Sequence, residues 1–169
     1  VQISYVAGDR YFQQSVTITP PATNSVPIRW YAAMDTYLGG QDNGTTVSTA
    51  IGTNLSAIGS TGVNSGAGTS VYIAEAQGGS EFSHYYSSTY NAANLYSGGI
   101  ANGGNIVDTT TATSNDIGIG AQWDLGTITA PTTITYNVAF AGEVTLDLDA
   151  DNSAAGGTSY ANAYEFGGS

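Results

Sequence analysis

The clearest indication of the fold is the stretch Ile117-Gly118-Ile119-Gly120-Ala121-Gln122-Trp123-Asp124-Leu125. Apolar residues alternate in it with glycine and polar residues, so every second side chain of an extended strand would lie on one face. The stretch 132–140 alternates in the same way, with Ile, Tyr, Val and Phe at its even positions from 134 onward. Such alternation is typical of antiparallel strands that bury one face. These two stretches therefore predict a β-domain.

Weaker alternation predicts further strands on either side of these two. They are expected at 1–6, 14–19, 26–33, 70–76 and 81–90, with a short one at Ile106 and Val107 and a last inward row of Val144, Leu146 and Leu148. Pro27 has no backbone donor, so its strand should begin there or lie at a sheet edge. The segment 45–68 is rich in glycine and small residues and is expected to be a long surface loop, with at most a short helical turn at 53–58.

Glycine-rich punctuation and the lack of any convincing helical pattern indicate one all-β domain. We predict a single antiparallel β-sandwich with long Gly-rich loops, stabilised by calcium for the reasons given below. The sandwich should occupy residues 1–146. The acidic stretch 147–169 is expected to be a C-terminal strand or a junction to a neighbouring domain, and the chain is expected to be part of a longer protein.

The charge of the chain is unusual in its sign. Thirteen acidic residues accompany two arginines and no lysine among 169 residues, for a net charge of −11. Nucleic acid and anionic membrane surfaces repel such a chain, and neither is expected as a partner. The absence of cysteine excludes disulfides and thiolate metal sites. The charge either only keeps the protein soluble or is partly neutralised by bound divalent cations, whose preferred ligands are carboxylate and carbonyl oxygens.

One acidic cluster follows the last predicted inward row. Asp147, Asp149 and Asp151 are spaced by two, so a curled loop could direct all three at one cation. The spacing matches only the start of a helical calcium loop, because Asn152 and Thr158 stand where glycine and glutamate are required. The alternatives are a calcium site at the end of a β-domain and a solvated strand end without metal. Mutual repulsion of three carboxylates favours the metal.

A second acidic stretch is Met34-Asp35-Thr36-Tyr37-Leu38-Gly39-Gly40-Gln41-Asp42-Asn43-Gly44. Asp35 and Asp42 bracket a Gly-Gly turn, and together with Asn43 they are candidate calcium ligands. Without metal, Asp42-Asn43-Gly44 would simply form a hairpin turn, because these residues tolerate a positive φ. Asp116 precedes the strand at 117–125 and either belongs to an ordinary turn or supplies one more oxygen to a cation.

Aromatic residues suggest a binding surface. Twelve tyrosines are present, and Tyr85, Tyr86 and Tyr90 cluster around the only histidine, His84. Exposed tyrosines supply rigid contact area with a polar tip, although most tyrosines in a sandwich fill the rim of its core.

Sequence motifs for catalysis are weak, and we expect the chain not to be an enzyme. His84 has no nucleophile-elbow serine to serve, and no glycine-rich nucleotide loop precedes a helix. Glu75 and Glu81 are the residues that a glycan-degrading enzyme would use.

Three stretches resemble extracellular modules of large bacterial RTX-type calcium-dependent adhesins. They are 35–44, the stretch 115–127 that begins Asn115-Asp116-Ile117-Gly118, and Tyr136-Asn137-Val138-Ala139-Phe140. The tail 146–160 resembles the acidic junctions between repeats of such proteins. The resemblance implies export to the bacterial cell surface, calcium-dependent folding, and cell adhesion or biofilm formation through a peptide or glycan on another cell.

Transferred by position, this resemblance makes Asp35, Asp42 and Asn43 ligand-side calcium residues and the 147–151 loop a structural one. Tyr37 and Gln41, on the same loop as Asp35 and Asp42, join the tyrosines as ligand-binding candidates. The alternatives are a carbohydrate-binding module of a secreted polysaccharide-active protein and a structural spacer domain.

Overall fold

The computed structural model describes residues 1–7, 9–51, 54–62, 69–76, 79–90, 100–111 and 113–142. The predicted row Val144, Leu146 and Leu148, the acidic cluster Asp147, Asp149 and Asp151, and the proposed boundary at 146 lie outside these residues.

The described part of the chain contains nine strands, and all of the strand pairs are antiparallel. The all-β prediction is confirmed. The strands are β1 (Gln2–Ser4), β2 (Tyr11–Ile18), β3 (Ile28–Asp35), β4 (Asn43–Ile51), β5 (Asn54–Gly62), β6 (Thr69–Glu75), β7 (His84–Thr89), β8 (Thr113–Gly126) and β9 (Thr132–Gly142). One 3₁₀ turn, η2, covers Ile100–Asn102. β3 begins directly after Pro27 and lies at a sheet edge, as expected.

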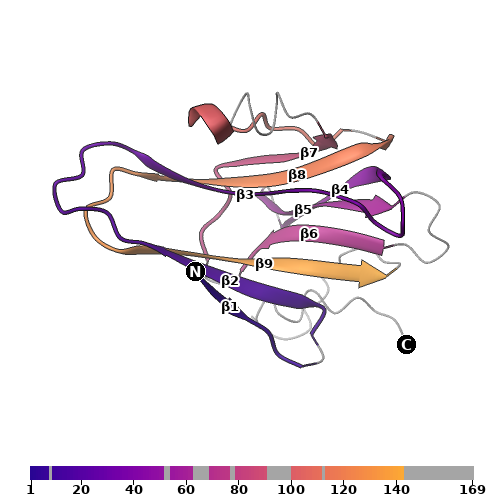
Figure 1. Cartoon of the computed structure of the whole chain (residues 1–169), viewed down its shortest axis with the longest axis horizontal. Coiled ribbons are helices and arrows are strands. Elements are labelled where there is room, and N and C mark those ends of the chain that lie inside the picture. The colour runs from indigo at the N-terminus through magenta and orange to yellow at the C-terminus, as the bar shows by residue number, and fades with distance from the viewer. Residues whose placement is uncertain are drawn as a thin grey trace.

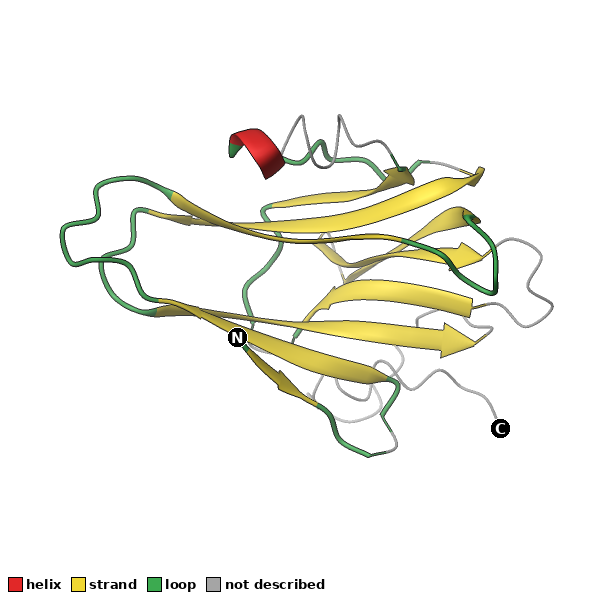
Figure 2. Ribbon diagram, viewed as in Figure 1, coloured by secondary structure: helices red, strands yellow, loops and turns green. Residues whose placement is uncertain are grey.

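The strands follow the order β1-β2-β9-β6-β5-β4-β8-β3, and β7 pairs with β8 as well. Figure 1 shows that β3, β8 and β7 lie as one layer above a second layer that contains β2, β9 and β6. The same two layers appear in Figure 2. β8 joins them, because its first residues pair with β4, which continues through β5 and β6 to β9, and the rest pair with β3 and β7. The architecture is thus a curled, sandwich-like sheet.

The core lies between the two layers and is built by the two stretches that alternate most strictly. Ile117, Ile119 and Trp123 of β8 are at most 1% exposed, and Ile134 of β9 is fully buried. The Trp123 ring stacks on Tyr136 of β9 with centroids 4.9 Å apart. The predicted inward faces of these strands are confirmed, except that Phe140 at the end of β9 is 47% exposed.

β8 is also covered on its second face, which the sequence predicts to be solvent-exposed. Residues 103–111, here called the strap, run across the outer side of β7 and β8 (Figure 1). Ile106 of the strap packs against Tyr86, and both are at most 2% exposed. Gly118 and Gly120 are buried beneath this layer. The short strand expected at Ile106 and Val107 is therefore wrong: these residues belong to a packed, irregular segment.

The segment 45–68 also departs from its prediction as a surface loop. Its described residues form β4 and β5, a hairpin in the middle of the sheet, in which Ala57 and Ile58 are fully buried. Small residues are needed here because the strands crowd one another. A Cβ on Gly59 would lie 2.3 Å from the carbonyl oxygen of Val71 and 2.6 Å from the Tyr72 ring. The glycine that weakens the hydrophobic pattern is thus required by the pairing of β5 with β6.

We predict that Gly59→Ala lowers the free energy of unfolding by about 3 kcal/mol, because its methyl group overlaps backbone that cannot move cheaply. Gly103→Ala is the matched control. Gly103 has φ +64 and nothing within 4 Å of an added Cβ, so only about 1 kcal/mol of left-handed strain is expected. Urea denaturation measures both. Equal losses in the two variants would mean that β5 is not packed against β6 as described.

Candidate functional site

The candidate site lies where β8 changes its pairing partner. Asp35, the last residue of β3, pairs with Gly118, while Asn43, the first residue of β4, pairs with Asp116. The chain therefore leaves the sheet at the end of β3 and re-enters it at the start of β4. Both of these ends pair with β8, at positions two residues apart. This register brings both ends of the loop 36–42 next to Asp116. Residues far apart in sequence meet here because backbone pairing fixes their positions.

The loop itself is closed by a tight turn. Leu38 and Gln41 exchange two backbone hydrogen bonds of 2.9 and 3.2 Å, and Gly39 and Gly40 between them have φ values of 63° and 77°. Two consecutive positive φ values define the two-residue turn that glycine favours. The hairpin turn expected at Asp42-Asn43-Gly44 is therefore wrong, because Asn43 and Gly44 begin β4.

Three carboxylates converge at the base of this loop. Asp35, Asp42 and Asp116 each place one oxygen within 4.8 Å of the others. Asp35 and Asp42 are exposed, whereas Asp116 is partly buried. The Oδ1 atom of Asp116 is buried and accepts no hydrogen bond within the described part of the chain. Asn43 lies directly opposite Asp116 in the ladder. These are oxygen donors of the kind that a hard divalent cation binds.

The electrostatics of the cluster disfavour three free carboxylates. Burial raises the pKa of Asp116 above its usual value, and the charges of Asp35 and Asp42 and a side-chain hydrogen bond with Asp35 raise it further. Neither arginine is placed to compensate among the contacts described: the Arg29 Nε donates to Asp124 at 3.1 Å, and Arg10 is exposed beside Phe140. The donor set and the buried Asp116 oxygen fit a cation. Of the predicted metal ligands, Asp35, Asp42, Asn43 and Asp116 are thus brought together.

The predicted ligand-binding residues do not form one surface. Tyr37 is 68% exposed on the loop between Asp35 and Asp42, with its hydroxyl donating to the Gly40 carbonyl at 2.9 Å. Gln41 is exposed on the same loop. Tyr85 is half-buried and packs against the core.

Two further tyrosines are buried or half-buried and come from β7 and the residue that follows it. Tyr86 is 2% exposed and its hydroxyl donates to the Thr89 carbonyl, so a ligand would reach its ring only by displacing the strap. Tyr90 is half-buried, and its backbone N–H donates to the Asp116 carbonyl at 2.5 Å. Of the five, only Tyr37 and Gln41 are exposed beside the acidic cluster.

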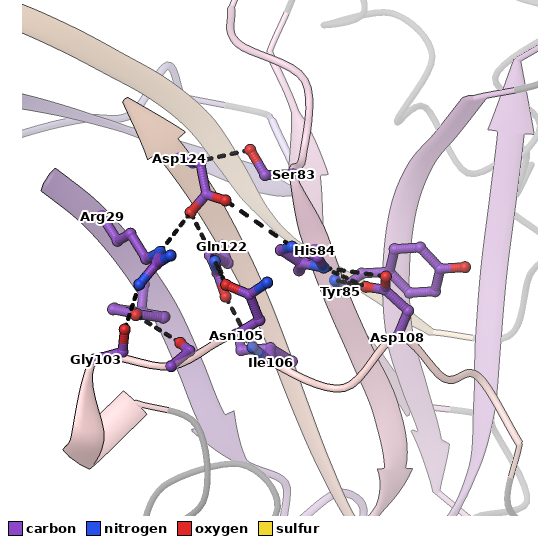
Figure 3. Close-up of polar contacts among 12 residues, drawn as sticks. Arg29, Ser83, His84, Tyr85, Gly103, Asn105, Ile106, Asp108, Gln122 and Asp124 are labelled. Carbon is purple, nitrogen blue, oxygen red and sulfur yellow. Dashed lines mark hydrogen bonds and ion pairs between the residues drawn. The ribbon is translucent and has the colours of Figure 1, made fainter. Parts of the chain in front are cut away.

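A network of hydrogen bonds holds the strap against β8 (Figure 3). The sequence pattern does not predict this network. The Gln122 side chain is fully buried in it. Its Oε1 accepts the backbone N–H of Ile106 at 2.8 Å, and its Nε2 donates to Asn105 at 3.1 Å and to Asp124 at 2.7 Å. Because each polar atom of Gln122 has a partner, its burial costs little. These contacts indicate a structural role.

The histidine belongs to the same network. His84 Nδ1 lies 3.0 Å from an oxygen of Asp108, and its Nε2 lies 3.9 Å from Asp124. Asp108 also accepts the backbone N–H of Tyr85 at 2.9 Å. Both ring nitrogens therefore face carboxylates, which indicates that His84 helps to hold the strap. No short sequence spacing signals this contact, because His84 and Asp108 are 24 residues apart.

Comparison of the chain with protein-family models, with curated proteins and with solved structures finds no match. The resemblance to RTX-type adhesins therefore stays a prediction. Within the described residues, no helix has both the length and the apolar character needed to cross a membrane.

We predict that Asp116→Asn stabilises the protein by about 1 kcal/mol at neutral pH when a chelator is present, because it removes a partly buried charge beside two others. The raised pKa fixes the sign. The neutral Asp116 carboxyl is favoured in the fold, so its contribution is complete in acid and is lost as the pH rises through the folded-state pKa. The Asp116→Asn protein should not show this loss of stability as the pH rises.

Thermal unfolding between pH 3.5 and 8 in chelator measures this effect. Asp9→Asn, which removes one charge from the β1–β2 turn, is the control and should follow the wild type. An Asp116→Asn protein that is less stable than the wild type at neutral pH would contradict the account of uncompensated repulsion.

Proposed function

We propose that the chain is a calcium-dependent ligand-binding module in which Asp35, Asp42 and Asp116 hold the ion. The observation that carries the proposal is the convergence of three carboxylate oxygens within 4.8 Å, one of them from a side chain with a buried oxygen that lacks a hydrogen bond. A divalent cation would satisfy that oxygen and remove the repulsion at once. Asn43, opposite Asp116, would offer a further oxygen.

Calcium fits this donor set better than other common metals. All the donors are oxygens, whereas zinc sites in proteins usually use His or Cys. Magnesium requires a near-ideal octahedron, while calcium accepts six to eight oxygens in irregular arrangements. A cluster assembled from two loop ends and one strand is irregular in this sense. Water or a ligand would supply the oxygens that three carboxylates and one amide do not.

The ion would act first as a cross-link. It would join the end of β3, the start of β4 and the first residues of β8, where the sheet changes its pairing. It would also fix the base of the loop 36–42. Because a ligand that binds only the folded state stabilises it by mass action, calcium should raise the stability of the whole domain.

The same loop supports a binding role. Asp35 and Asp42 are exposed, so the ion would face solvent on one side, and the exposed Tyr37 ring belongs to the loop between them. An exposed aromatic side chain beside an accessible cation suits recognition of a glycan or a peptide. Adhesion at a bacterial cell surface is the role that we propose for such a module, on the strength of the resemblance given above.

We predict that millimolar Ca²⁺ raises the melting temperature by about 5–10 °C over chelator, as expected for about 2.7 kcal/mol of stabilisation at a hundredfold excess over Kd. Calorimetric titration and thermal unfolding measure this response. Mg²⁺ should give a much smaller shift. Asp42→Asn should abolish most of the calcium response, because it removes one of the three carboxylates.

Asp149→Asn removes one charge from the C-terminal acidic cluster, which the sequence also predicts to bind calcium, and it tests which of the two clusters carries the response. We expect it to keep the calcium response that Asp42→Asn loses. The opposite result, in which Asp149→Asn alone abolishes the response, would assign calcium binding to the C-terminal cluster and refute the proposed site.

We further predict that Tyr37→Ala removes binding to a glycan or peptide found on an array, while the calcium-induced shift in melting temperature persists. Tyr5→Ala serves as the comparison, since Tyr5 is 63% exposed and lies after β1, outside the loop 36–42. Binding that survives Tyr37→Ala unchanged, or that is insensitive to chelator, would contradict the proposed binding surface.

A further inference from the structure

Glu75 occupies a position in β6 at which the alternation of apolar residues predicts another apolar side chain. It follows Val71 and Ile73 on the inward face of β6 and pairs with the inward-facing Tyr136 of β9. Its side chain is buried, with 8% exposure. A carboxyl group at the end of a core-facing row needs a specific partner, because burial of an ionised group is costly.

That partner is the crossover, residues 79–83, which leads from β6 in one layer to β7 in the other (Figure 1). The backbone N–H of Phe82 donates to Glu75 Oε1 at 2.7 Å. Ser80 is held by Trp123, whose indole Nε1–H donates to its carbonyl at 2.9 Å. The Phe82 ring packs edge-on against Trp123 with centroids 5.3 Å apart. Glu75 and Trp123 therefore hold the crossover from the two layers.

The charges around Glu75 disfavour its ionised form. The titratable groups that face it among the described residues are Glu81 on the crossover and Tyr136 on β9. Arg29 is bound to Asp124 under the strap, and Arg10 is exposed in the β1–β2 turn. Burial raises the pKa of Glu75 to about 7, the Phe82 N–H lowers it in part, and the Glu81 charge raises it again.

We propose that Glu75 and the crossover form a latch between the two layers, closed while the carboxyl is neutral and loosened when it ionises. An ionised Glu75 would bind the Phe82 N–H more strongly, but burial of its charge beside Glu81 would cost more than this bond gains. Water would therefore enter the end of the core, and Phe82 would lose its packing on Trp123. The latch does not depend on the proposed calcium site, because Glu75 is not among the residues of that cluster.

The direction of the pH dependence follows from the raised pKa. A carboxyl that holds its proton more tightly in the fold contributes stability that is complete below its ordinary value of 4.5. That contribution falls as the pH rises and is lost as the pH passes about 7. The latch should therefore loosen across neutral pH, from about 6 to 8.

Hydrogen exchange of the wild-type chain followed by NMR tests the latch. Two protons report on it directly: the Phe82 amide and the Trp123 indole N–H. We expect their protection factors, corrected for intrinsic exchange, to fall at least about tenfold from pH 6 to 8, while that of Ile119 in β8 stays constant. Glu75→Gln should keep both protons protected at pH 8. Glu81→Gln should move the transition to lower pH.

Protection of Phe82 and Trp123 that does not change between pH 6 and 8 in the wild type would overturn the proposal, whatever the variants do. A wild-type loss of protection that Glu75→Gln reproduces would also overturn it. If Glu75→Gln does not fold, Glu81→Gln decides: an unmoved transition would then mean that another group causes the loss.

Discussion

The repulsion among Asp35, Asp42 and Asp116 governs the chemistry of the candidate site. Sheet pairing, not side-chain attraction, holds their oxygens within 4.8 Å, because β8 exchanges β4 for β3 between Asp116 and Gly118. The chain cannot relieve this repulsion with its own cations, since it has two arginines and no lysine. The free energy stored in the cluster is therefore available to a divalent cation, which would gain affinity from the preformed arrangement.

The same shortage of cations explains how the rest of the molecule treats its acidic groups. Arg29 is used to hold the strap, through Asp124 and the Gly103 carbonyl. Glu75 is buried close to Glu81, and burial raises its pKa to about 7. Protonation of Glu75 and the cation that we propose at Asp116 are thus two chemical solutions to one problem, buried oxygen atoms with too few positive charges nearby.

Period-two alternation was sufficient to predict the fold class and the inward faces of β8 and β9, because those strands bury large side chains on alternate positions. It missed β4 and β5, since Gly59 and its small neighbours carry little hydrophobic signal and are required only by contact with Val71 and Tyr72. It also missed that the second face of β8 is covered, because Gly118 and Gly120 on that face are buried but carry no hydrophobic signal. Local sequence predicted Asp35 and Asp42 as a pair and Asp116 as a possible donor, but only long-range register unites the three.

Crystal structures of the chain grown with Ca²⁺ and with chelator would show whether a cation occupies the acidic cluster. We expect one strong peak of difference density among Asp35, Asp42 and Asp116 in the calcium form, with Asp116 Oδ1 among the ligands of the ion. Anomalous scattering would identify the ion. Only water at that position in calcium-rich crystals, with the three carboxylates still in contact, would contradict the account, because their repulsion would then be tolerated without a cation.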